Sequence, residues 1–123
     1  MKRILIVDDD VNVRTMIRHF LEKAGYLVAD ASNGELGLEL CREAPFDLII
    51  IDIFMPEKEG LETIREIRRD FPEAKIIAIS GGGTSGEFSY LSLAKNFGAM
   101  RAMAKPFYRE ELIQVVKELL GQE

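Results

Sequence analysis

The sequence has little cysteine and no long hydrophobic run. Its single thiol, Cys41, cannot form an internal disulfide or a cysteine zinc site, which favours a reducing compartment. No apolar run approaches the roughly 20 residues that cross a bilayer. The first ten residues hold only a four-residue apolar run between a basic pair and three aspartates, which is unlike a signal peptide. We therefore expect a cytoplasmic protein without membrane contact.

Basic residues are fewer than acidic residues. Lys and Arg number 16 against 21 Asp and Glu, a formal net charge of −5, and no basic run stands out. Duplex nucleic acid needs a positive surface, so a direct nucleic-acid partner is not expected. The 123 residues, 47% hydrophobic and 30% charged, can bury a core and contain no linker, repeat or low-complexity segment. We expect one domain over residues 1–123.

Short apolar runs alternate with longer amphipathic segments, a pattern that predicts a parallel α/β sheet. The runs are typical of strands buried on both faces, and apolar residues recur between them at helical spacing. Gly37 weakens the second helix. The predicted strands are residues 4–7, 26–31, 47–52, 75–79 and 100–104, and the helical stripes lie within 13–24, 38–41, 61–71, 91–97 and 112–119.

Polar residues follow four of the five predicted strands. They are Asp8 to Asp10, Asp52, Ser80, and Lys105 with Pro106. Ligands of open parallel sheets bind outside the carboxyl ends of the strands, where the strand order reverses. We therefore expect these side chains to meet at one edge. The second predicted strand ends in Asp30-Ala31-Ser32, which could be ordinary loop polarity.

These residue types suit metal-assisted phosphoryl transfer. Carboxylates brought together repel one another, and a divalent cation relieves the repulsion. All-oxygen ligation favours Mg²⁺. A carboxylate can also attack phosphorus and carry an aspartyl phosphate, while a lysine and a hydroxyl stabilise the charge on the transferred group.

The chain resembles the receiver domain of bacterial two-component response regulators. The similarity covers nearly the whole chain in the family's order and spacing. The matching stretches are residues 4–9, residues 47–56 with Asp52 followed by Met55-Pro56, Gly60, Ser80-Gly81, Gly98-Ala99 and Lys105-Pro106-Phe107. The resemblance implies a flavodoxin-like, doubly wound (βα)5 fold, with helices on both faces of a parallel sheet of order 2-1-3-4-5.

The resemblance also implies roles for individual residues. Asp52 would be the phosphoacceptor, and Mg²⁺ would be bound by Asp8, Asp9, Asp52 and the backbone carbonyl of Phe54. Ser80 and Lys105 would contact the phosphoryl group, and the Lys105-Pro106 peptide bond would be cis. The phosphodonor would be a histidine kinase, a histidine phosphotransfer protein or a small acyl phosphate.

Three features depart from the family's common pattern. Ala102 occupies a position that is usually Tyr or Phe and that reports phosphorylation, so another group takes over that coupling or the switch is muted. Phe54 is bulkier and less polar than many family members carry there. The loop at residues 81–86 is rich in glycine, and we expect it to be mobile without phosphate.

Each residue also has a simpler interpretation. The three aspartates could cap the following helix, a role that we assign to Asp10 while leaving the other two for the metal. Ser80 could be a turn serine and Lys105 a solvated lysine. Outside the site, His19 is interpreted as solvated, and Cys41 and the methionines are interpreted as packing residues; those methionines are Met16, Met100 and Met103.

The sequence is compatible with three functions. The first is a phosphoaccepting signalling switch whose face of fourth helix, fifth strand and fifth helix binds a downstream protein, or the chain's own output domain if the chain is a fragment. The second is a receiver-like interaction module that has lost phosphorylation-dependent switching, for which Ala102 leaves room. The third is a phosphohydrolase acting through an aspartyl phosphate, but such enzymes need an acid or base where Phe54 stands. The first is the main interpretation, and the module is then no enzyme beyond slow self-phosphorylation and self-dephosphorylation.

The bulk of Phe54 leads to a prediction. We expect its ring to restrict the water that attacks the phosphoryl group, so Phe54→Asn should shorten the half-life of the phosphoprotein. Following the decay of phosphorylated wild type and variant side by side tests this. An unchanged half-life would rule out the idea.

Overall fold

The computed structural model describes residues 1–53, 59–80 and 93–121. Five parallel strands form one sheet in the order β2-β1-β3-β4-β5, which confirms the predicted flavodoxin-like topology. The strands are β1 (Arg3–Val7), β2 (Leu27–Ala31), β3 (Leu48–Asp52), β4 (Lys75–Ser80) and β5 (Arg101–Ala104). The helices are α1 (Val11–Lys23), α2 (Gly34–Glu43), α3 (Glu59–Asp70) and α5 (Arg109–Leu120), and residues 93–97 are also helical.

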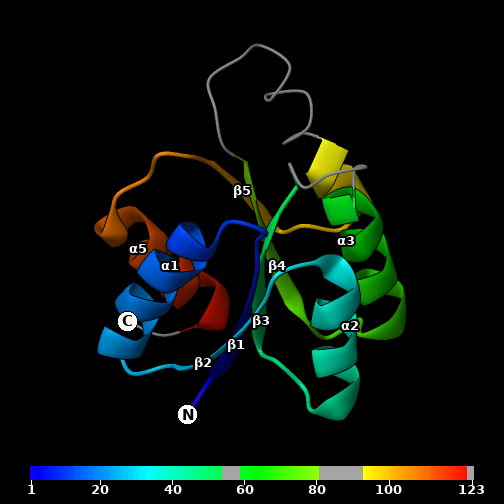
Figure 1. The fold of residues 1–123 in the computed structure, drawn as a ribbon, viewed down its shortest axis with the longest axis horizontal. Coiled ribbons are helices and arrows are strands. Elements are labelled where there is room, and N and C mark those ends of the chain that lie inside the picture. Colours follow the sequence, from blue (N-terminus) through cyan, green and yellow to red (C-terminus); the bar gives the residue numbers. More distant parts are fainter. Residues whose placement is uncertain (54–58, 81–92, 122–123) are drawn as a thin grey trace.

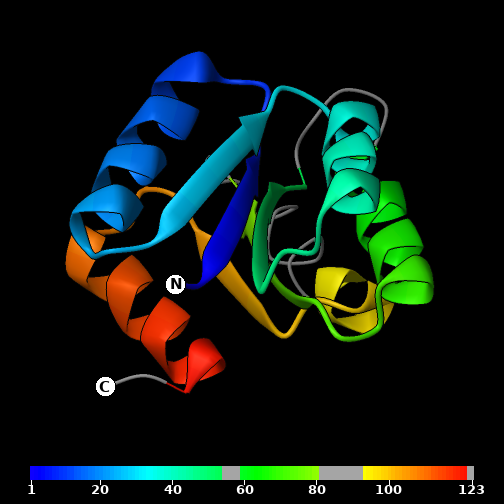
Figure 2. The ribbon, with the colours of Figure 1, turned by 90° about the horizontal axis from the view of Figure 1, so that it is seen from below.

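Helices cover both faces of the sheet. Helices α1 and α5 lie on one face, and α2 and α3 lie on the other with the 93–97 segment (Figures 1 and 2). This arrangement explains why the central strands have no polar alternation, since both of their faces are buried. Every residue of β3 is buried, as are Ile4 to Val7 of β1.

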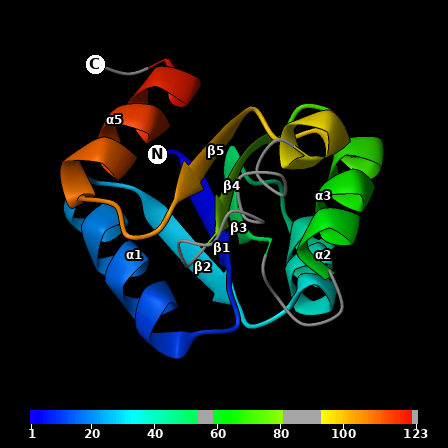
Figure 3. The ribbon, with the colours of Figure 1, turned by 90° about the horizontal axis from the view of Figure 1, so that it is seen from above.

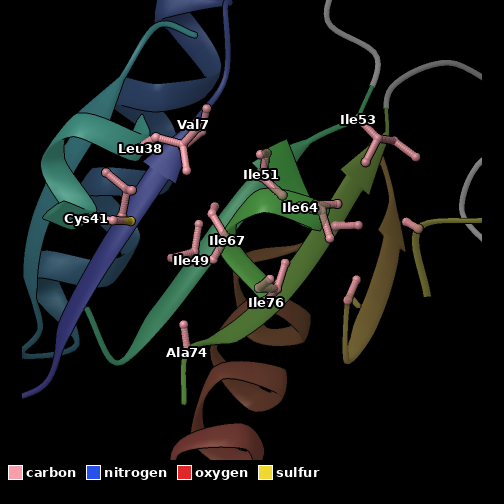
Figure 4. Packing of buried hydrophobic residues seen from close by; sticks show 14 of the residues in the cluster. Val7, Leu38, Cys41, Ile49, Ile51, Ile53, Ile64, Ile67, Ala74 and Ile76 are labelled. Carbon is pink, nitrogen blue, oxygen red and sulfur yellow. The ribbon is translucent and has the colours of Figure 1, made fainter. Parts of the chain in front are cut away.

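Alternate residues of the central strands β1, β3 and β4 contribute to two separate cores. Leu5, Val7, Ile49 and Ile51 pack toward α2 and α3, where Ile64 and others meet them (Figure 4). The intervening strand residues pack toward α1 and α5, which supply Ile17, Leu21, Leu112, Val116 and Leu120. The period of two in the strands and the helical stripes therefore account for the whole three-layer arrangement.

Local signals set the helix ends. Asp10 is the N-cap of α1, and its side chain accepts a hydrogen bond from the Asn12 amide at 2.8 Å, as predicted for this aspartate. Asn33 caps α2 in the same way through the Leu36 amide at 2.9 Å. Gly25, just beyond the C-cap of α1, has a φ of 98°, a left-handed conformation that favours glycine.

The side chains outside the sheet edge largely match their predicted environments. His19 is exposed and Cys41 is buried, and burial raises the pKa of its thiol to about 11. Met103 is buried as predicted. The packing prediction is wrong for Met16 and Met100, which are 39% and 48% exposed, because each lies on the solvent side of the chain rather than against a core cluster. Among the residues that the structure describes, no helix is long and apolar enough to cross a membrane.

At Gly60 the backbone of α3 lies very close to the end of β3. A Cβ atom at this position would lie 2.4 Å from the carbonyl oxygen of Asp52 and 2.5 Å from the Cα of Ile53. Both neighbours are backbone atoms, which cannot rotate away. Only glycine lets the start of α3 lie directly against the end of β3.

This contact leads to a prediction. Gly60→Ala should destabilise the fold by about 1–3 kcal/mol, because overpacking forces the α3 backbone away from the sheet. Chemical denaturation of wild type and variant measures the loss. Gly37→Ala is the matched control, since its Cβ would meet a Val7 methyl group at 2.9 Å, which can shift, and alanine favours a helix. Equal stabilities for Gly60→Ala and wild type would contradict the argument.

Candidate functional site

The carboxyl ends of the strands bring the predicted polar residues to one edge, which Figure 3 views from above. Strand β1 runs directly into Asp8, and β3, β4 and β5 end at Asp52, Ser80 and Ala104. The parallel registers align these ends, with Val7 opposite Ile51, Asp52 opposite Ile79 and Ser80 opposite Ala104. Strands β1 and β3 flank the point where the strand order reverses, so Asp8 and Asp52 lie at the position where such folds bind ligands.

Three carboxylates converge there. One oxygen each from Asp8, Asp9 and Asp52 lie within 4.8 Å of one another. Asp8 is fully buried, Asp52 is 4% exposed, and Asp9 is exposed. Buried carboxylates this close repel strongly unless a cation accompanies them. The group could therefore hold a metal ion with oxygen ligands alone.

Lys105 supplies a cation to this group. Its Nζ lies 3.0 Å from Asp8 Oδ2 and 3.6 Å from Asp52 Oδ2, and its side chain is 19% exposed. Its backbone amide donates to the carbonyl of Ser80 at 2.7 Å, which holds the chain after β5 against the end of β4. The Lys105-Pro106 peptide bond is cis. One ammonium offsets one of the three carboxylate charges, which leaves the edge negative and suited to a divalent cation.

Ser80 presents a buried hydroxyl to the same edge. The residue is fully buried, and its Oγ has no hydrogen-bond partner among the described residues. A buried hydroxyl without a partner costs on the order of 1–3 kcal/mol. Such a group fits a site that is completed by a ligand with oxygen acceptors.

Asp10 differs from its two neighbours. Its carboxylate caps α1, and its amide donates to Asp8 Oδ1 at 2.9 Å. It therefore orients Asp8 and is not one of the three converging carboxylates. The aspartate run divides into two acids at the site and one at the helix.

Three other predicted features have different outcomes. The carbonyl of Phe54 and the glycine-rich loop at residues 81–86 lie outside the described residues. Ala102 is described: it pairs with Ala78 and lines a cavity of about 480 Å³ between β5 and α5, together with Met103, Ala104, Glu111, Gln114 and Val115. The methyl group of Ala102 leaves this part of the surface hollow, while the role suggested for the position by the resemblance stays a prediction.

The sequence analysis missed two residues next to the site, Arg14 and Asp30. An Arg14 Nη atom donates to the backbone carbonyl of Asp8 at 2.7 Å, and Arg14 Nε lies 3.4 Å from Asp30 Oδ1. Asp30 lies within β2, as the predicted range of the second strand requires. An acid inside an otherwise apolar strand was the available signal, because it needs a partner.

Comparisons with known proteins agree with this geometry. The family model for the response regulator receiver domain matches residues 4–117. The chain is 36% identical to the receiver protein CpdR of Brucella abortus, over 98% of each chain, and 36% identical to the chemotaxis protein CheY of Thermotoga maritima, over 96% of this chain and 97% of that one. It is 32% identical to the longer regulator DctR of Bacillus subtilis, of which it covers 51%.

Solved structures give the same result. The response regulator TrrA of Thermotoga maritima, crystallised in complex with Mg(2+)-BeF, has a TM-score of 0.85 at 39% identity, with 98% of this chain and 100% of that one covered. A receiver domain protein of Methanospirillum hungatei has a TM-score of 0.89 at 31% identity, with 98% and 94% covered. The chain therefore belongs to the response regulator receiver domain family.

Proposed function

We propose that this chain is a phosphoaccepting switch of a two-component system or phosphorelay, acting in the cytoplasm as one domain over residues 1–123. Asp52 takes a phosphoryl group from the phosphohistidine of a histidine kinase or histidine phosphotransfer protein. The observation that carries the proposal is the buried Asp52 carboxylate, 3.6 Å from Lys105 Nζ and grouped with two further acids at the carboxyl edge of the sheet.

Asp52 is the nucleophile. One of its carboxylate oxygens forms a bond to phosphorus as the bond from phosphorus to the histidine nitrogen breaks, and the nitrogen keeps the electron pair. Lys105 is close enough to pair with an oxygen of the transferred group. The Ser80 hydroxyl, which has no partner among the described residues, donates a hydrogen bond to another.

Asp8, Asp9 and Asp52 would hold Mg²⁺, with the Phe54 carbonyl as a further ligand. The all-oxygen donor set and the excess negative charge fit a hard divalent cation better than a thiophilic one. When bound, the ion would neutralise the carboxylates and offset charge on the transferring oxygens. The protein's own contribution is to hold the acids, Lys105 and Ser80 in fixed positions around Asp52.

The output surface is the face formed by residues 93–97, β5 and α5. A downstream protein partner binds it, or an output domain of the same protein does. Relatives of both kinds exist, since CheY of Thermotoga maritima is matched over 97% of its length and DctR over 51%. Neither nucleic acid nor membrane is a direct partner of this module.

One observation supports a second candidate function. A cavity lies beside Ala102, the position at which the resemblance to receiver domains implies an aromatic residue that reports phosphorylation. Without that side chain, the chain could serve as a receiver-like interaction module whose partner binding does not depend on phosphate. Measuring partner binding with and without phosphorylation distinguishes the two functions. The affinity for the partner changes on phosphorylation if the chain is a switch and stays the same if it is an interaction module.

The phosphoacceptor role leads to a prediction. Wild-type protein incubated with acetyl phosphate and Mg²⁺ should gain the mass of one phosphoryl group, and Asp52→Asn should gain none, because an amide is not the nucleophile. Intact-mass spectrometry measures the adduct. Asp70→Asn, at an exposed carboxylate at the end of α3, is the matched control and should behave as wild type. Continuous release of phosphate without an adduct would indicate a hydrolase, and no reaction would favour the interaction module.

Lys105 leads to a second prediction. Lys105→Met should bind Mg²⁺ more tightly, on the order of tenfold, because the ammonium now lies 3.0 Å from Asp8 and repels an approaching cation. The same variant should accept phosphate more slowly from acetyl phosphate. Calorimetric titration measures the first effect, with Lys75→Met as the control, since Lys75 contacts the Leu119 carbonyl at the other end of β4. Weaker Mg²⁺ binding by Lys105→Met would contradict the assignment.

A further inference from the structure

Arg14 lies between the acidic site and a second strand. It is the fourth residue of α1, and its side chain is 15% exposed. One Nη atom donates to the backbone carbonyl of Asp8 at 2.7 Å, and its Nε lies 3.4 Å from Asp30 Oδ1. A guanidinium presents its donors in a fixed plane, so an acid that binds one side of it also orients the other.

Asp30 is itself held in place. Its second oxygen pairs with Arg18 at 2.5 Å, and Arg18 also donates to the carbonyl of Val28 at 3.0 Å. The next residue of β2, Ala31, accepts the amide hydrogen of Asp8 at 3.1 Å. Strand β2 therefore fixes the Asp8 backbone directly through its amide and indirectly, through Asp30 and Arg14, at its carbonyl.

With these contacts, all four polar groups of Asp8 have partners. The amide and carbonyl are bound by Ala31 and Arg14, while Oδ1 and Oδ2 are bound by the Asp10 amide and Lys105. Asp10 is in turn fixed as the cap of α1. Asp9, between them, has no hydrogen bond or ion pair to another described residue. The position of the Asp9 carboxylate therefore depends on the backbone of the two residues that flank it, Asp8 and Asp10, both of which are held by hydrogen bonds.

The geometry points to Arg14 as a positioning residue for the metal-binding acids, with Asp30 as the group that orients Arg14. This inference rests on the proposed function, because it takes Asp8 and Asp9 as the residues that would hold Mg²⁺. Groups that orient metal ligands commonly contribute 10- to 100-fold to metal affinity. The contact to the Asp8 carbonyl sets the direction in which both acids leave the end of β1.

The sign of the effect separates positioning from simple charge. Arg14 places a positive charge beside a divalent cation site, so charge alone predicts tighter Mg²⁺ binding when it is removed. Loss of positioning predicts weaker binding. The two effects on Mg²⁺ affinity have opposite signs. A loss of affinity on removal of Arg14 can therefore come from lost positioning but not from the lost positive charge.

The test is a calorimetric titration of the full chain with Mg²⁺ alone. Arg14→Met should bind roughly tenfold more weakly than wild type, at the lower end of the range for groups that orient ligands. The double variant Arg14→Met with Asp30→Asn removes the pair without changing the net charge and should show a similar loss. Arg14→Lys should recover part of the affinity because it can still donate to the Asp8 carbonyl.

Arg18 offers the matched control. It binds the same Asp30 and a β2 carbonyl but makes no hydrogen bond or ion pair with Asp8, so Arg18→Met should lose stability without a comparable loss of Mg²⁺ affinity. Thermal melting of every variant shows that each is folded at the titration temperature. Asp30→Asn alone provides a variant that retains Arg14 and should also bind Mg²⁺ more weakly.

Unchanged or tighter Mg²⁺ binding by Arg14→Met and by the double variant would overturn the inference. A loss that Arg18→Met shares in full would overturn it too, because the effect would then reflect the general stability of α1 and β2. Failure of wild type to bind Mg²⁺ would overturn both this inference and the proposed metal site. If wild type binds Mg²⁺ but accepts no phosphate, the proposed function fails while the titration still supports Arg14.

Discussion

Repulsion among three carboxylates at one edge of the sheet is the constraint on which the site depends. Two of these acids are buried, and the neighbouring lysine offsets only part of their charge. A protein chain tolerates such a group where function requires it, since any apolar residue would pack there at lower free energy. The surrounding contacts all serve to hold the acids together against that repulsion. The Lys105 ammonium and the Arg14 guanidinium bring positive charge to Asp8, and the Asp10 amide donates a hydrogen bond to its carboxylate.

The topology explains why residues so distant in sequence can meet. Strands β1 and β3 are neighbours because the chain first adds β2 on one side and then returns to build the other, and the acids stand at that reversal. Lys105 reaches Asp8 across 97 positions of sequence. Burial of both sheet faces leaves the carboxyl edge as the place where polar groups can gather, which is why a core rich in isoleucine ends in charged residues.

Much of this could be predicted from the sequence. The strand runs and helical stripes gave the fold class, and the residues that end the runs gave Asp8, Asp9, Asp52, Ser80 and Lys105, because strand ends in a parallel sheet share an edge. The strand order came from the resemblance to receiver domains, since periodicity does not say which strands are neighbours. The predicted and observed strand boundaries differ by about one residue, as with β5, which begins at Arg101 rather than at residue 100.

The remainder depends on tertiary contacts that leave no local pattern. The sequence allows Asp30 to be read as ordinary loop polarity, whereas the structure pairs it with two arginines of α1. Gly60 was recognised as part of a motif, but its close contact with the Asp52 carbonyl could not be inferred from spacing. The positions of Met16 in a helical stripe and of Met100 at the start of a predicted strand favour packing, but both residues are exposed.

The burial of Cys41 has a practical consequence for studying this molecule. The residue is 5% exposed, and burial raises the pKa of its thiol to about 11, so the thiol is almost wholly protonated at neutral pH and reacts slowly with alkylating reagents. Because the sequence has no other cysteine, a thiol introduced at an exposed position such as Val11 would be labelled selectively. A fluorophore or spin label could thus be attached beside the acidic edge in an otherwise native background.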